Sequence, residues 1–75
     1  MTHVDVRFRY SQQPGINQMQ AIDAVRDVYG IRRIVFDEKD RTVLVEYDAS
    51  RLNEAAVAAL LRGAGVDIEE KIALA

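Results

Sequence analysis

A histidine and a carboxylate near the start of the chain are the side chains with the most obvious chemistry. His3 and Asp5 alternate with apolar residues, so they share one face of a predicted strand. An imidazole and a carboxylate are potential ligands for a divalent cation, but a metal site needs three or four convergent ligands. We therefore interpret His3 as a solvated side chain. Weak binding of a hard or borderline metal through His3 and carboxylates stays open as an alternative.

Two arginines continue the same face of this strand. Arg7 and Arg9 have the charge and spacing to hold a phosphate or a carboxylate group. Acidic residues on the neighbouring predicted strands would lie on the same sheet face and neutralise them, namely Glu46, Asp67 and Glu69. The pattern therefore favours cross-strand ion pairs over an anion site.

The chain has no cysteine. This excludes disulfides, thiolate metal ligands and cysteine nucleophiles together. The sequence also shows no histidine near a serine nucleophile and no glycine-rich phosphate loop. We expect a domain that is not an enzyme and that carries no cofactor.

Composition narrows the classes of partner. The chain has 75 residues, with 12 acidic against 10 basic side chains and a net charge of −2. An acidic balance argues against a nucleic-acid partner, because phosphate-backbone binding depends on clustered lysine and arginine. Charged residues interrupt every apolar stretch, so we expect no membrane partner. The N-terminal sequence lacks the features of a signal peptide, so we expect a single domain in the cytoplasm.

The first strand and helix can be predicted from periodicity. Val4, Val6, Phe8 and Tyr10 alternate with polar residues, which indicates a half-buried strand. Pro14 and Gly15 then predict a type II turn with a positive φ at the glycine. A helix is expected over residues 18–29. Asn17 is the expected cap of this helix, paired with Gln20 in a capping box, and Ile16 is the expected hydrophobic staple. Gly30 is expected to end the helix. The predicted buried stripe consists of Ala21, Ile22, Val25, Val28 and Tyr29.

The second half of the chain repeats the strand and helix signals. Residues 31–37 and 42–48 predict a hairpin in which Phe36 faces Val43 and Val35 faces Leu44. Asn53 is the expected cap of a helix over residues 54–64. The buried side chains expected of this helix are Val57, Leu60, Leu61 and Ala64, and Gly65 ends it. A last strand with Val66, Ile68, Ile72 and Leu74 has Glu70 on its inward side, which predicts a frayed or bulged edge.

The order β-α-β-β-α-β predicts an α+β, ferredoxin-like fold. Right-handed crossovers place the four antiparallel strands in the order 4-1-3-2, with both helices on one face of the sheet.

A set of scaffold residues resembles the heavy-metal-associated domain of copper chaperones, mercury-binding proteins and metal-pumping ATPases. The matching residues are Gly30, Ile31, Ile34, Phe36, Val43, Val45, Tyr47, Asp48, Ala64, Gly65 and Val66. The resemblance covers nearly the whole chain. It implies a Met-x-Cys-x-x-Cys metal motif between the first strand and the first helix, where this chain has Gln12, Pro14 and Asn17. A prolyl ring and an amide cannot replace thiolates for Cu(I), so the motif is degenerate and no metal site is predicted there.

Two hypotheses about function follow. The first is a protein-interaction or regulatory module that binds a protein partner or forms a weak homodimer. Its candidate surfaces are the exposed pair Val35 and Leu44, and the loop made by Gln12, Gln13, Pro14, Gly15, Ile16 and Asn17. The second hypothesis is a sensor of amino acids. It rests on Pro14 and Gly15, which resemble the Pro-Gly turn of ACT domains.

Overall fold

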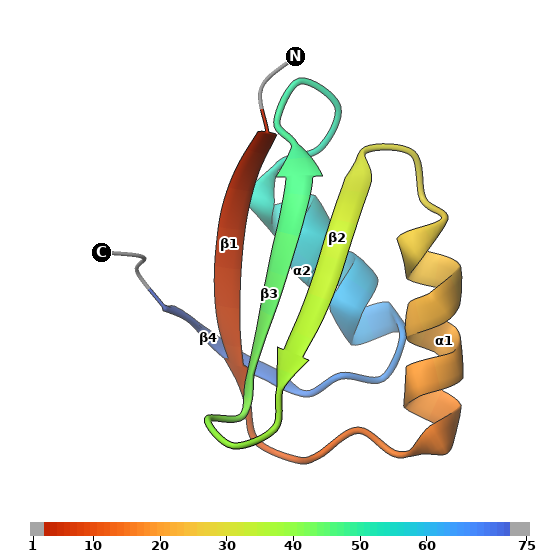
Figure 1. Cartoon of the computed structure of the whole chain (residues 1–75), viewed down its shortest axis with the longest axis vertical. Helices are drawn as coiled ribbons and strands as arrows, with labels where there is room; N and C mark the ends of the chain where they lie inside the picture. Colours follow the sequence, from red (N-terminus) through yellow and green to blue (C-terminus); the bar gives the residue numbers. More distant parts are fainter. Residues whose placement is uncertain (1–2, 73–75) are drawn as a thin grey trace.

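Six elements make up the computed structural model, which describes residues 3–72. In chain order they are β1 (His3–Tyr10), α1 (Ile16–Arg26), β2 (Ile31–Asp37), β3 (Thr42–Asp48), α2 (Glu54–Gly63) and β4 (Ile68–Ile72). The strands pair antiparallel in the order β2-β3-β1-β4 (Figure 1). The predicted ferredoxin-like topology and strand order are therefore confirmed.

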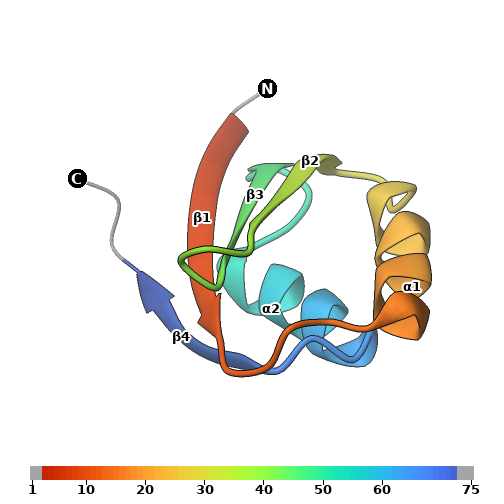
Figure 2. The ribbon, with the colours of Figure 1, turned by 60° about the horizontal axis from the view of Figure 1, so that its bottom comes forward.

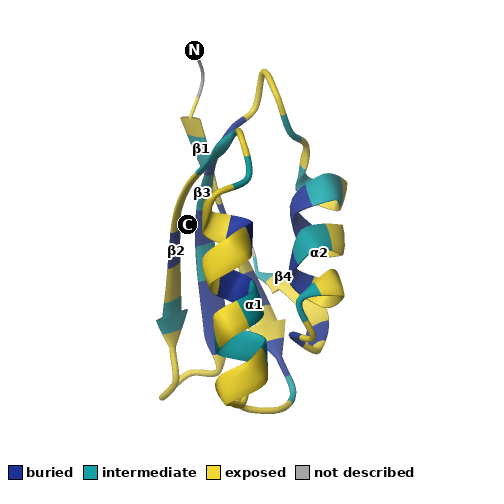
Figure 3. Ribbon diagram, turned by 90° about the vertical axis from the view of Figure 1, so that its right-hand side faces the viewer, coloured by how far each residue is buried: buried dark blue, intermediate teal, exposed yellow. Residues whose placement is uncertain are grey.

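The core lies between the sheet and the two helices. Alternate strand residues point inward and meet the buried side chains of α1 and α2. The central buried set is Val6, Phe8, Tyr10, Ile34, Val43, Val45, Ile22, Val25, Val57 and Leu61. Both helices cover the same face of the sheet (Figures 2 and 3). The opposite face of the sheet is left open to solvent, and it faces the viewer in Figure 1.

The start of α1 differs from the prediction. The cap is Gly15, whose backbone N–H donates to the side-chain oxygen of Gln18 at 3.0 Å. Asn17 is already helical, so its predicted capping role and the pairing with Gln20 are wrong. Gly15 has a φ of −83°, so the predicted positive φ is also wrong. The Gln18 side chain thus accepts the N–H of the cap residue itself, whereas an Asn17 cap would have accepted an N–H of the first helical turn.

The end of α1 is also earlier than predicted. The helix stops at Arg26, and Gly30 has a positive φ of 104° at the end of the connecting loop rather than directly after the helix. Tyr29 therefore leaves the helical stripe and is 72% exposed, contrary to the prediction. Its ring instead carries the guanidinium of Arg51, which lies 4.2 Å from the ring centroid. A cation–π contact between two loops takes the place of burial.

The second helix follows the prediction closely. The side chain of Asn53 accepts a hydrogen bond from the backbone N–H of Ala56 at 2.7 Å, which confirms the cap. The helix ends at Gly63, and Gly65 has a φ of 96°. Leu61 is fully buried, whereas Leu60 is only half-buried.

The hairpin register is the predicted one, with Phe36 opposite Val43 and Val35 opposite Leu44. The bulge in the last strand is confirmed as well, because the pairing shifts between Arg9 opposite Glu70 and Tyr10 opposite Ile68. The extra residue turns Glu70 outward, so it is exposed rather than inward. Val66 is buried just before the strand, and the predicted Leu74 lies outside the described residues.

Candidate functional site

Three connections meet at the end of the sheet where the degenerate motif lies. The backbone N–H of Tyr10 donates to the carbonyl of Arg41 in the hairpin at 3.0 Å. The N–H of Ser11 donates to the carbonyl of Asp67 at 3.1 Å, and the Ser11 hydroxyl donates to the Asp67 carboxylate. The loop after β1 is thus tied to the hairpin turn and to the segment before β4 (Figure 2).

The side chains at the three motif positions do not fit a soft metal ion. Gln12 and Asn17 are exposed amides and Pro14 is a half-buried ring, so none supplies the sulfur that Cu(I) requires. Within residues 3–72, no three histidine or carboxylate side chains gather closely enough to hold a metal. The loop is therefore a structural connection that keeps the position of the motif without its ligands.

One apolar side chain stands out beside this loop. Ile16 begins α1 and is 78% exposed, so the staple predicted for it does not form. Gln12, Gln13 and Gly15 are also exposed. The loop surface of residues 12–17 thus combines amides with a single large aliphatic group.

The open face of the sheet carries a row of three apolar side chains and one arginine. Strand pairing places Val35 opposite Leu44, Leu44 opposite Arg7, and Arg7 opposite Ile72. Directly paired residues project to the same face, so this row crosses all four strands. Val35 is 44% exposed, and Leu44 and Ile72 are half-buried. We call these four residues the open-face row.

Charged residues flank the open-face row on both sides. One flank contains Arg33 opposite Glu46 and Glu46 opposite Asp5. The other contains Asp37 opposite Thr42, Thr42 opposite Arg9, and Arg9 opposite Glu70. The result is a strip in which apolar side chains outnumber the single arginine, with charged residues on both sides, a composition found at interaction sites.

The predicted ion pairs of the two arginines are only partly right. Arg9 pairs with Glu70 at 3.5 Å, not with Asp67 or Glu69, because the bulge brings Glu70 opposite Arg9. Arg7 takes part in none of the ion pairs found between residues 3 and 72. Its side chain stays exposed in the middle of the open-face row.

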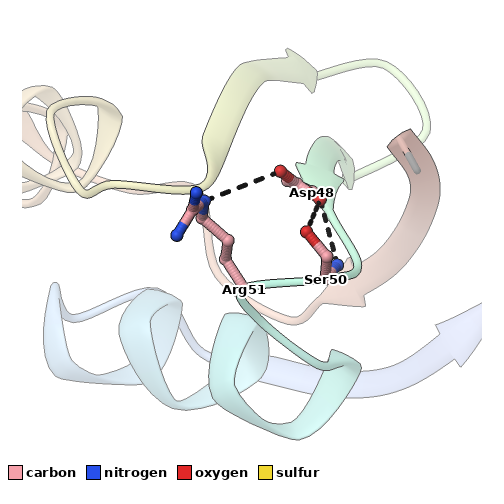
Figure 4. Close-up of polar contacts among 3 residues, drawn as sticks. All are labelled: Asp48, Ser50 and Arg51. Carbon is pink, nitrogen blue, oxygen red and sulfur yellow. Dashed lines mark hydrogen bonds and ion pairs between the residues drawn. The ribbon is translucent and has the colours of Figure 1, made fainter. Parts of the chain in front are cut away.

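A second polar cluster lies at the opposite end of the sheet and was not predicted. The carboxylate of Asp48 accepts hydrogen bonds from the Ser50 hydroxyl at 2.6 Å and the Ser50 N–H at 3.0 Å (Figure 4). Arg51 approaches the second carboxylate oxygen at 3.9 Å. The sequence signal was the spacing Asp48-x-Ser50, which is typical of a side-chain turn.

This cluster fixes two loops against each other. Asp48 is only 4% exposed, and its backbone N–H donates to the carbonyl of Gly30 at 2.8 Å. Hydrogen bonds from Ser50 hold the pKa of Asp48 below its ordinary value, with smaller contributions from the charges of His3 and Arg51. A surface pocket of about 430 Å³ opens beside these loops. Asp48, Ser50 and Arg51 are paired with one another, so we interpret this cluster as a structural contact between the loops.

The comparisons with known proteins agree with this scaffold. No protein-family model matches the chain, and no curated protein matches it. Among solved structures, the apo form of the HMA domain of copper chaperone for superoxide dismutase is similar, with a TM-score of 0.65 and 26% sequence identity. The match covers 91% of this chain and 66% of that chain, so the present chain spans about two thirds of its length.

The chain therefore has a scaffold like that of a heavy-metal-associated domain, as the sequence resemblance implied. It combines this scaffold with a cysteine-free loop, so the family's motif is degenerate. No helix in the described part of the chain is long and apolar enough to cross a membrane.

Proposed function

We propose that this domain is a non-catalytic protein-interaction module and that its main docking surface is the open sheet face. The observation that carries the proposal is the open-face row of Val35, Leu44, Arg7 and Ile72. Burying such a strip removes apolar surface from water at about 25 cal/mol per Å². The charged flanks then select the partner and its orientation.

The degenerate loop supports a role other than metal transport. Its exposed donors are amides, and the chain has no cysteine. The matched HMA domain comes from a protein named as a copper chaperone, but the ligand chemistry of such a carrier has no counterpart in these residues. The scaffold is thus used here for contacts rather than for cargo.

The alternative candidate for the docking surface is the loop of residues 12–17. The specific observation in its favour is Ile16, a large aliphatic side chain exposed in the first turn of α1. A partner that covered this loop would bury Ile16 together with the amides of Gln12 and Gln13. This surface and the open face lie on different parts of the molecule, so a binding footprint distinguishes them.

A backbone NMR titration tests the class of function. Separate additions of Cu(I), Zn²⁺ and a panel of amino acids should leave the resonances of residues 12–17 and of His3 unchanged. Saturable shifts with a metal would overturn the proposal in favour of a carrier that uses non-cysteine ligands. Saturable shifts around Pro14 and Gly15 with one amino acid would establish the ACT-like sensor instead.

A further inference from the structure

On two of the four strands, the charges of the open sheet face are arranged antisymmetrically about the open-face row. On β1, Asp5 and Arg9 lie two residues before and after Arg7. On β2, Arg33 and Asp37 lie two residues before and after Val35. Each of these strands thus carries opposite charges at equal distances from the row.

We infer that the partner of this face is a second copy of the chain, packed face to face about a twofold axis that runs along the open-face row. Such an axis places each strand opposite the same strand of the other copy, running in the reverse direction. A residue two positions before the row therefore faces the residue two positions after the row in the other copy. Asp5 then faces the Arg9 of the second copy, and Arg33 faces its Asp37. The twofold axis repeats each contact, which gives four ion pairs around the apolar row. The inference rests on the proposed use of the open face for protein contacts.

The other simple arrangement brings more like charges together. A twofold axis parallel to the strands, placed between β1 and β3, would exchange β1 with β3 and β2 with β4. Asp5 would then face Glu46 of the second copy, and Asp37 would face Glu70. Like charges across an interface oppose association, so the axis along the open-face row is favoured.

The isolated sheet contains a like-charge contact that this dimer relieves. Asp5 and Glu46 are direct cross-strand partners, and two carboxylates in this position repel each other. Arg33 lies opposite Glu46 from the other side, whereas Asp5 has no cation among the cross-strand partners found within residues 3–72. In the dimer, Arg9 of the second copy supplies that cation.

Two features make the dimer weak. The row and its flanks span four strands spaced about 4.8 Å apart, which gives a footprint at the small end of protein interfaces. Arg7 also lies on the axis, where it faces Arg7 of the second copy. Its guanidinium must therefore extend toward the acidic flank while its aliphatic stem covers Leu44 and Ile72. We therefore expect association at about 1 mM chain that reverses on dilution.

Mixing two charge-reversal variants tests this geometry directly. Asp5→Arg places two arginines opposite each other, and Arg9→Asp places two aspartates opposite each other, so each variant alone should sediment as a monomer. In an equimolar mixture, every one of these contacts joins an arginine to an aspartate. The mixture should therefore regain a dimer about as stable as that of the unmodified chain, in a salt-dependent way.

Control variants keep the test decisive. Arg9→Asp places an acid beside Glu70, so both proteins are also prepared in a Glu70→Gln background and their thermal unfolding is compared with the parent. Val35→Lys with Leu44→Lys should abolish the dimer, and Arg7→Leu should strengthen it at least several-fold by removing the central like-charge contact.

A strict monomer at about 1 mM, or folded variants that show no heterodimer on mixing, would overturn the second copy as partner. Those results would leave a different protein as the occupant of this face. Failure of the interaction module itself would appear separately, as metal or amino-acid binding in the NMR titration.

Discussion

The side chain of Gln18 occupies the space that a Cβ at Gly65 would need, since that atom would stand 2.9 Å from the Cγ of Gln18. The same glutamine accepts the N–H of Gly15 at 3.0 Å. One side chain therefore closes the loop before α1 and packs against the loop before β4. The close contact and the positive φ of 96° at position 65 both favour glycine over a residue with a side chain.

Two glycines two residues apart make a matched pair for stability. Gly65→Ala should lower the free energy of unfolding by at least about 1 kcal/mol, because the left-handed backbone and Gln18 both oppose a methyl group. Gly63→Ala should raise it by up to about 1 kcal/mol, because Gly63 is helical and no atom lies within 4 Å of the added Cβ. Urea unfolding of both variants checks the opposite signs. An unchanged stability of Gly65→Ala would show that the contact with Gln18 is misplaced.

Two adjacent leucines of α2 should differ in their contribution to stability. Leu61→Ala should cost about 2–5 kcal/mol, because the side chain is fully buried and a small core cannot collapse around the cavity. Leu60→Ala should cost clearly less, because Leu60 is half-buried. Urea unfolding of the two variants measures the difference, and a larger loss at Leu60 would mean that the wrong face of α2 is in the core.

Asp48 should make the stability sensitive to acid. Its pKa is lower in the folded protein than in the unfolded chain, so its contribution is complete at neutral pH. That contribution is lost as the pH falls below about 4 and the carboxylate is protonated. Asp48→Asn should therefore show a smaller loss of stability between neutral and acid pH than the parent. Urea unfolding across this range measures it, and identical pH profiles would contradict the role assigned to the Ser50 hydrogen bonds.

Cysteines placed at two motif positions should restore metal binding to the loop. Pro14→Cys with Asn17→Cys supplies two thiolates at the spacing that heavy-metal-associated domains use, so the double variant should compete with a chelator for Cu(I). The parent should not compete, and each single variant should bind more weakly than the double variant. If the double variant stays folded and does not bind Cu(I), the assignment of Pro14 and Asn17 to the motif positions is wrong.

The sheet could be predicted from the sequence because its signals are local and repeated. Alternation set the faces of β1, β2 and β3, and the short hairpin turn set the register of Val35 against Leu44. The apolar pair on the open face was therefore expected. Its extension to Ile72 was not, because the position of Ile72 depends on the bulge that shifts β4 against β1.

The ends of α1 could not be predicted because several nearby residues serve the same purpose. Gly15 and Asn17 are both acceptable caps, and the Gln18 side chain that accepts the Gly15 N–H also packs against Gly65, a residue distant in sequence. Tyr29 fits a helical stripe by spacing alone. Its exposure follows from an early helix end and from Arg51, which is distant in sequence and stacks on it only in the folded chain.

Photo-cross-linking in cells from position 35 tests most directly whether the open sheet face is the docking surface. A photoreactive residue replaces Val35 in one variant, exposed Arg62 on the outer side of α2 in a second, and Ile16 in a third. We predict a discrete adduct, with another protein or a second copy, from position 35 alone. An adduct from position 16 with none from position 35 would contradict this prediction and move the docking surface to the loop of residues 12–17.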